Sequence, residues 1–160
     1  MKRVINTDSA ELDLTKVYEQ GGPRAFKPNG LWYSIDREWE DWCRDNMDHW
    51  IKKHNIELVI DESRMLILKT LPQIDRFRES FESVSDYSHR IKEVDWEKVR
   101  QVYAGIEIQN YHKLKGWGFN PMFDSMWFYG WDVSSGCIWD LSIIKKVTVK
   151  SIRNDKKESA

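Results

Sequence analysis

The stretch from residue 27 to residue 43, KPNGLWYSIDREWEDWC, limits the possible folds more than any other part of the chain. It contains the turn-forming pair Asn29-Gly30, then a short apolar run over residues 31–34, then apolar side chains at three- and four-residue steps. The run predicts a strand, and the steps predict an amphipathic helix over approximately residues 36–53. A strand that passes directly into a helix, with tryptophans on both, is also a plausible wall for a flat ligand.

The remaining segments predict an α+β fold in one domain over residues 1–152, which suits a chain of 160 residues. We expect a polar lead-in over residues 1–13, helices that begin at Leu71 and Trp96, and a flexible charged tail over residues 153–160. The expected strands cover residues 14–19, 31–34, 106–108, 126–132, 137–141 and 145–152. Residues 56–60 and 65–69 are expected to form either a hairpin or one strand with a sharp kink.

Composition argues against several classes of protein. A net charge of −1 lacks the basic excess of a general nucleic-acid binder. No apolar run approaches the roughly 20 residues that span a membrane, and the chain does not begin with a signal-peptide pattern, so we expect no membrane association and a cytoplasmic location. Cys43 and Cys137 lack metal-type spacing and are expected to be reduced, buried thiols. His49 and His54 are five residues apart on the expected helix, so we expect no metal site.

The strand Gly30-Leu31-Trp32-Tyr33-Ser34, followed by a helix with Glu40-Asp41-Trp42-Cys43, resembles the second NAD-contacting strand of the ADP-ribosyltransferase superfamily. That superfamily includes the poly(ADP-ribose) polymerases and related toxins. The resemblance implies an ADP-ribosyltransferase-like split antiparallel sheet with two or three helices, and NAD as the substrate. A second run, residues 127–144, resembles the end of uncharacterised bacterial and phage proteins and implies no function.

The resemblance also implies roles for individual residues. The strand residues that would line the nicotinamide pocket are Gly30, Trp32, Tyr33 and Ser34, and Trp42 would stack on the nicotinamide. Residues 17–21 lack the His or Arg that binds the NAD ribose in the family, and Arg24 is a nearby candidate to replace it. The family's catalytic glutamate lies on a later strand, where Glu107 is the candidate. Residues 135–140 have the hydrophobic shape of the family's last motif but lack its glutamate, so Asp132 or Asp140 is a further candidate acid.

Each of these residues also has a purely structural interpretation. A carboxylate such as Glu107 beside the ribose would stabilise the positive charge that develops when nicotinamide leaves, but Glu107 could equally be a solvent-facing strand residue. Trp42 lies on the apolar stripe of its helix, where core packing is usual. Because strand residues alternate between faces, Trp32 and Ser34 share one side and Tyr33 takes the other.

Two further polar groups are candidates for binding an anion. Arg24 lies in a loop rich in glycine and proline, where its guanidinium could bind a phosphate or remain solvated. Asp132 is followed by Ser134-Ser135-Gly136, a group whose N–H groups and hydroxyls suit an anion but also suit a tight hairpin turn. The candidate ligand contacts here are Asp132 and Ser135.

The sequence therefore leaves three hypotheses open. The first is an NAD- or nucleotide-binding ADP-ribosyltransferase-like enzyme that transfers ADP-ribose to a protein or nucleic-acid acceptor. The second is a non-catalytic module that binds a nucleotide or a protein, such as an accessory or anti-defence protein of a phage or another mobile element, which the missing family residues favour. The third is a nucleic-acid binder in which lysines form one basic face, namely Lys113, Lys115, Lys145, Lys146 and Lys150.

Overall fold

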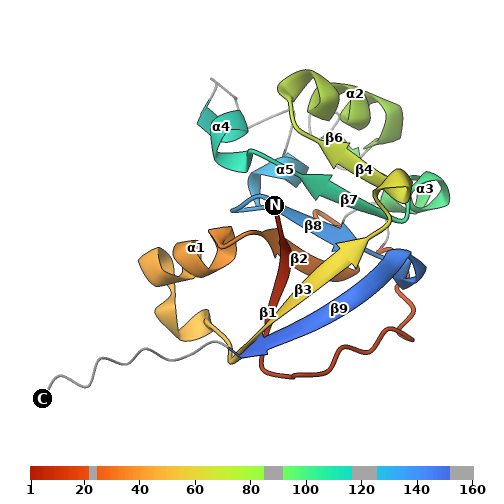
Figure 1. Ribbon diagram of the computed structural model, residues 1–160. Coiled ribbons are helices and arrows are strands. Elements are labelled where there is room, and N and C mark those ends of the chain that lie inside the picture. The colour runs from red at the N-terminus through yellow and green to blue at the C-terminus, as the bar shows by residue number, and fades with distance from the viewer. Residues whose placement is uncertain (22–24, 85–91, 117–125, 152–160) are drawn as a thin grey trace, which may run out of the picture.

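A seven-stranded mixed sheet forms the centre of the structure, in the strand order β4-β7-β8-β2-β1-β3-β9 (Figure 1). The computed structural model describes residues 1–21, 25–84, 92–116 and 126–151. The strands of this sheet are β1 (Arg3–Thr7), β2 (Leu31–Ile35), β3 (His54–Ile60), β4 (Met65–Leu68), β7 (Gly105–Ile108), β8 (Ser135–Ile138) and β9 (Ile144–Ser151). Only β4 and β7 run parallel, so the α+β class is confirmed, while the sheet is continuous and mixed instead of split and wholly antiparallel.

The helices are short and gather in two groups (Figure 1). On one flank, α1 (Glu38–Asn46) is followed by the 3₁₀ turn η1 (Asp48–Trp50). Near the β4 and β7 end of the sheet lie α2 (Leu71–Phe81), α3 (Trp96–Val102), α4 (Tyr111–Gly116) and α5 (Met126–Tyr129), with a separate pair of strands, β5 (Glu82–Val84) and β6 (Lys92–Val94). The remaining 3₁₀ turns are η2 (Glu62–Arg64) and η3 (Leu141–Ile143).

Local sequence explains where the longer helices begin. Thr70 and Gln73 form a reciprocal capping box at the start of α2, and Pro72 lies in the first turn, where its missing N–H costs nothing. Asp95 accepts a hydrogen bond from the backbone N–H of Lys98 and caps α3. These two helix starts were expected from the sequence and are confirmed. The helix expected over residues 36–53 is shorter, because the backbone leaves the helical region at Met47 and resumes as η1.

Aromatic rings from α2, α3 and α5 fill the core beside the sheet. The Phe77 ring lies 5.0 Å from the Trp127 ring and 6.0 Å from the Trp96 ring, measured between centroids. Ile106 and Ile108, which share one face of β7, are completely buried in the same core cluster as these rings. Burial of large aromatic and aliphatic side chains is the main favourable term in folding, so these contacts hold the helices on the sheet.

Five expectations about strands are wrong. Residues 1–13 contain β1, an interior strand of the sheet, and residues 14–19 form no strand because they pair with no neighbour. Neither the hairpin nor the single kinked strand forms, since β3 pairs with β1 and β9 while β4 pairs with β7. Residues 126–129 form the helix α5, and the side chains of Trp127 and Phe128 both lie in the core. Residues 135 and 136, expected in a turn, belong to β8.

The structure leaves some expectations untested. Arg24 and the tail over residues 153–160 lie outside the described residues. Among the helices that the structure describes, none combines the length and the apolar character needed to cross a bilayer. The strands expected near residues 31–34, 106–108 and 145–152 are confirmed as β2, β7 and β9.

Candidate functional site: a tryptophan-lined cleft

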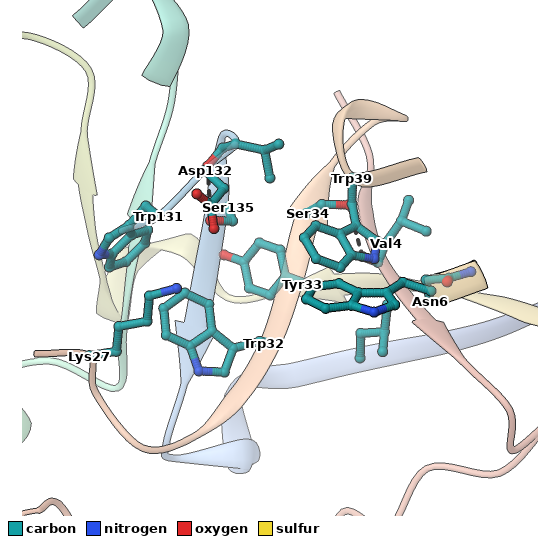
Figure 2. A pocket seen from close by; sticks show the side chains of 13 residues that line it. Val4, Asn6, Lys27, Trp32, Tyr33, Ser34, Trp39, Trp131, Asp132 and Ser135 are labelled. Atoms are coloured by element: carbon teal, nitrogen blue, oxygen red, sulfur yellow. Dashed lines mark hydrogen bonds between the residues drawn. The ribbon is translucent and has the colours of Figure 1, made fainter. Parts of the chain in front are cut away.

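A cleft of about 490 Å³ lies over β2 and the neighbouring ends of β1 and β8 (Figure 2). Four indole rings dominate its lining, together with a few polar side chains and one residue of each charge. The lining residues that the argument below uses are Asn6, Lys27, Trp32, Ser34, Trp39, Trp50, Trp131, Asp132 and Ser135. A mostly apolar cleft of this size with a few polar groups is the usual form of a small-molecule site.

Strand β2 forms the floor of the cleft. Side chains alternate along a strand, so Trp32 and Ser34 face one side of the sheet and Tyr33 faces the other. Ser34 pairs with Ser135 on β8 and with Val4 on β1, which extends the same face across three strands. The aromatic strand predicted from the sequence is therefore present, and its Trp32 and Ser34 face the cleft.

The walls of the cleft come from two separate segments. On one side, the ring of Trp131 meets the ring of Trp32 edge-on, with centroids 4.9 Å apart. On the other side, α1 supplies Trp39, and η1 supplies Trp50, whose ring lies 6.1 Å from that of Trp39. Figure 2 shows Trp39 and Asn6 at one end of the cleft and Trp131 at the other. Such indole surfaces bind flat rings by stacking and edge-on contact.

Trp42 does not line this cleft. Its ring stacks on Trp39 at 5.2 Å with an angle of 8° between the planes, so it lies one ring away from the cleft. Trp42 instead borders a separate hollow with Glu38, Asp41 and Asp45. Trp39, on the same helix stripe, occupies the place that the sequence assigned to Trp42.

Lys27 and Asp132 lie at the Trp131 end of the cleft (Figure 2). The Lys27 ammonium nitrogen is 5.4 Å from the centroid of the Trp32 ring, a cation–π contact. Asp132 has a φ of 65°, in the left-handed region that few residues other than glycine adopt. The Ser135 hydroxyl also belongs to this end, but it donates to the backbone carbonyl of Val133.

Glu107 lies behind the floor of the cleft and is completely buried. Strand register places Glu107 opposite Gly136 and Gly136 opposite Tyr33, so the three residues form one row across β7, β8 and β2. Because Gly136 has no side chain, the Tyr33 phenol crosses over it and donates a hydrogen bond of 2.6 Å to Oε2 of Glu107. The row faces away from Trp32 and Ser34, on the opposite side of the sheet from the cleft-facing side chains.

The Glu107 carboxylate is fully engaged in this position. Arg3 donates to Oε2 through Nε at 2.6 Å and to Oε1 through Nη2 at 3.3 Å, and Gln109 donates to Oε1 through its side-chain amide. Burial, and then the negative charge of Glu107, raises the pKa of Tyr33 well above its usual value. Burial alone would lower the pKa of Arg3, but its hydrogen bonds and its attraction to Glu107 outweigh that effect and raise it.

The structure brings together five of the residues singled out from the sequence, namely Trp32, Tyr33, Ser34, Asp132 and Ser135. Gly30 has a structural role instead, because a methyl group there would lie 2.6 Å from both Cys137 Sγ and the Ile138 carbonyl oxygen of β8. Arg24 lies outside the described part of the chain. Sequence reasoning did not assign Asn6, Lys27 or Trp131 to the site. Asn6 is on β1, which was not predicted as a strand, and Lys27 lies in the loop before the predicted strand β2.

Two other kinds of chemistry lack a site in the structure. Among the described residues, no group of histidine, cysteine and carboxylate side chains is arranged to hold a metal ion. Both thiols are buried, and burial raises the pKa of Cys43 and of Cys137, which disfavours the thiolate that a nucleophile needs.

No protein-family model, curated protein or solved structure matches this chain. The interpretation of the cleft therefore depends on its own geometry.

Proposed function

We propose that this protein binds a nucleotide, NAD or a related one, with the flat base held among the indoles of the cleft. The observation that supports the proposal is the lining itself: Trp32, Trp39, Trp50 and Trp131 surround one opening of about 490 Å³. Stacking of a base on an aromatic side chain contributes roughly 1–3 kcal/mol. On the floor, the Ser34 hydroxyl donates to the Val4 carbonyl and keeps oxygen lone pairs that can accept a hydrogen bond from the ring. The Asn6 amide at one end is already bonded to residues 52, 54 and 55 and contributes a fixed polar edge.

Binding without turnover is the form of this proposal that the geometry favours. A catalytic carboxylate has to reach the ribose, but Glu107 is buried and occupied by Arg3, Tyr33 and Gln109. Its side chain also leaves β7 on the sheet face opposite Trp32 and Ser34. A protein that sequesters a nucleotide needs the aromatic cleft but needs no carboxylate at the ribose.

ADP-ribosyl transfer is the second candidate, and it includes the ADP-ribosyltransferase-like architecture. One observation favours it: Tyr33 belongs to the cleft lining and its hydroxyl holds the Glu107 carboxylate at 2.6 Å. Glu107 is thus linked by one hydrogen bond to the strand that forms the floor of the cleft, on the face away from the cleft. In this candidate, Glu107 orients a ribose hydroxyl and stabilises the developing positive charge, and a protein or nucleic acid accepts the ADP-ribose.

Calorimetric titration of NAD, ADP-ribose and the four common ribonucleosides tests binding. We expect Trp39→Leu to weaken the affinity about tenfold, because one stacking surface is lost. Trp42→Leu is the matched control, since it removes an indole of the same helix that lies outside the cleft, and we expect less than about a threefold change. Equal effects of the two variants would exclude this cleft as the site.

Release of nicotinamide from NAD separates the two candidates. Binding of NAD with no release of nicotinamide supports the binding protein. Release that Glu107→Gln abolishes, in a variant that remains folded by circular dichroism, supports transfer.

A further inference from the structure

The Trp131 end of the cleft contains two opposite charges, Lys27 and Asp132. The side chains of Lys27 and Asp132 form no hydrogen bond or ion pair with any residue that the structure describes. Some exposed charges of this protein pair, as Arg64 does with Asp140 at 2.6 Å and Lys150 with Glu57 at 2.7 Å, and others, such as Lys53 and Asp75, form no ion pair among the described residues. What distinguishes Lys27 and Asp132 is that both border the cleft where a ligand was already proposed.

The surroundings of Lys27 keep its ammonium group at the cleft. Its stem runs beside Gly130, where an added methyl group would lie 3.6 Å from Cε of Lys27, and its nitrogen lies over the ring of Trp32. A lysine ammonium in such a position is a compact positive charge with three donors, which suits the oxygens of a phosphate.

The backbone at Asp132 is strained in a way that fixes its position. Its φ of 65° accompanies a hydrogen bond of 2.7 Å from the Val133 N–H to the Trp131 carbonyl, the pattern of a rare γ-turn with positive φ. Such conformations persist only where the surrounding structure holds them, and they are concentrated at binding sites. Here the strained turn presents a carboxylate, an acceptor-only group that suits the hydroxyls of a sugar.

We propose that this end of the cleft recognises the ribose phosphate of a ribonucleotide, with Lys27 on the phosphate and Asp132 on a ribose hydroxyl. The proposal deepens the nucleotide-binding function and depends on it. Base, ribose and phosphate then occupy the cleft in order, from the Trp39 end toward the Trp131 end (Figure 2). The ligand class is a ribonucleoside monophosphate, free or as one half of a dinucleotide.

Asp132 has a second consequence for the ligand, because its negative charge also repels the phosphate. Asp132→Asn keeps a side chain that tolerates positive φ while it removes the charge. We expect this variant to bind the monophosphate at least as tightly as the original protein and to lose its preference for ribose over deoxyribose. Loss of sugar selectivity without loss of affinity would be difficult to explain by damage to the fold.

Calorimetry with each common ribonucleoside, its 5′-monophosphate and the 2′- and 3′-deoxy monophosphates tests the assignment. For the preferred base, we expect the phosphate to improve affinity about tenfold, as a charge-assisted hydrogen bond does, and Lys27→Met to remove that gain. Lys16→Met is the matched control, because Lys16 lies over the ring of Tyr18 at 4.9 Å outside this cleft, and we expect it to keep the gain.

The possible outcomes separate this inference from the proposed function. If a ribonucleoside binds but its phosphate adds no affinity, or if Lys27→Met preserves the gain, the assignment of Lys27 is wrong while nucleotide binding stands. If the protein does not distinguish ribose from either deoxyribose, the role of Asp132 is wrong. If neither nucleosides nor nucleotides bind at millimolar concentration, both proposals fail.

Discussion

Two sets of charges lie on opposite sides of β2, and they differ in almost every physical respect. Behind the strand, Arg3 and Glu107 are buried and hydrogen-bonded to each other, with Tyr33 completing the group. In front of it, Lys27 and Asp132 border the cleft and form no ion pair with any described residue. A buried charge without a partner strongly destabilises the folded state, whereas a charge at an open cleft remains hydrated until a ligand binds.

The comparison shows why the glutamate in the expected strand is a poor guide to catalysis. Glu107 was singled out because a carboxylate on a later strand fits the family pattern. A structural role explains the presence of Glu107 equally well. Arg3 neutralises its charge, and the hydrogen bonds among Arg3, Tyr33 and Glu107 fix the register of β1, β2 and β7. Lys27 and Asp132 line the cleft without an ion pair among the described residues, so they are the better candidates for contact with a ligand.

The largest expected effect comes from breaking the buried group. Glu107→Gln leaves the Arg3 guanidinium buried without its main partner, and we expect the free energy of unfolding to fall by about 3 kcal/mol. Urea denaturation measures this change. Glu62→Gln is the control: Glu62 also pairs with Arg3 but is exposed, so we expect a loss below about 1 kcal/mol. Equal losses would mean that the buried and exposed partners of Arg3 do not differ in importance.

A smaller effect should follow from disturbing the Tyr33 ring. In Gly136→Ala the added methyl group would lie 2.3 Å from the Tyr33 hydroxyl, and we expect this overpacking to cost about 2 kcal/mol. Gly130→Ala is the matched control, because among the described residues its methyl group would contact Lys27 alone, at 3.6 Å. We expect the free energy of unfolding to change by less than about 0.5 kcal/mol. Both are measured by denaturation. A Gly136→Ala protein with the original free energy of unfolding would show that the Tyr33 ring does not need the space above residue 136.

The smallest effect concerns alkaline pH. Because the pKa of Tyr33 is raised in the folded state, Tyr33 contributes stability that is complete below the unfolded value of 10.0 and is lost as the pH rises toward the higher folded value. We therefore expect the free energy of unfolding to decrease above pH 10, and to decrease less steeply in Tyr33→Phe. Denaturation curves between pH 8 and pH 11 measure the difference. The same slope in both proteins would assign the alkaline loss to other groups.

The sequence predicted the elements whose signals are local. The strand β2, the capped helices α2 and α3, and the alternating strand β9 each carry their own pattern of capping, turn or apolar residues. Half of the site followed from β2, because the alternation that places Trp32 and Ser34 on one face is a property of any strand. The mixed α+β class followed from the same elements.

The missed elements depend on partners that are distant in sequence. The segment RVINT reads as polar, and β1 becomes an interior strand only because Glu107 neutralises Arg3 from a position 104 residues away. The run before β8 looked like a strand because its aromatics are consecutive, but the core takes Trp127 and Phe128 from a helix. Once β1 and α5 were misplaced, Asn6 and Trp131 could not be assigned to the cleft.

The interior position of β1 sets an order for assembly during translation. At roughly 5–20 residues per second, the ribosome needs on the order of ten seconds to make the segment between Arg3 and Glu107, and during that time the arginine lacks its buried counter-charge. Strand β2 obtains its second pairing partner even later, because β8 is synthesised after β7. Closure of the sheet is therefore a late event governed by distant pairings, which favours slow folding and gives chaperones a long interval in which to bind the nascent chain.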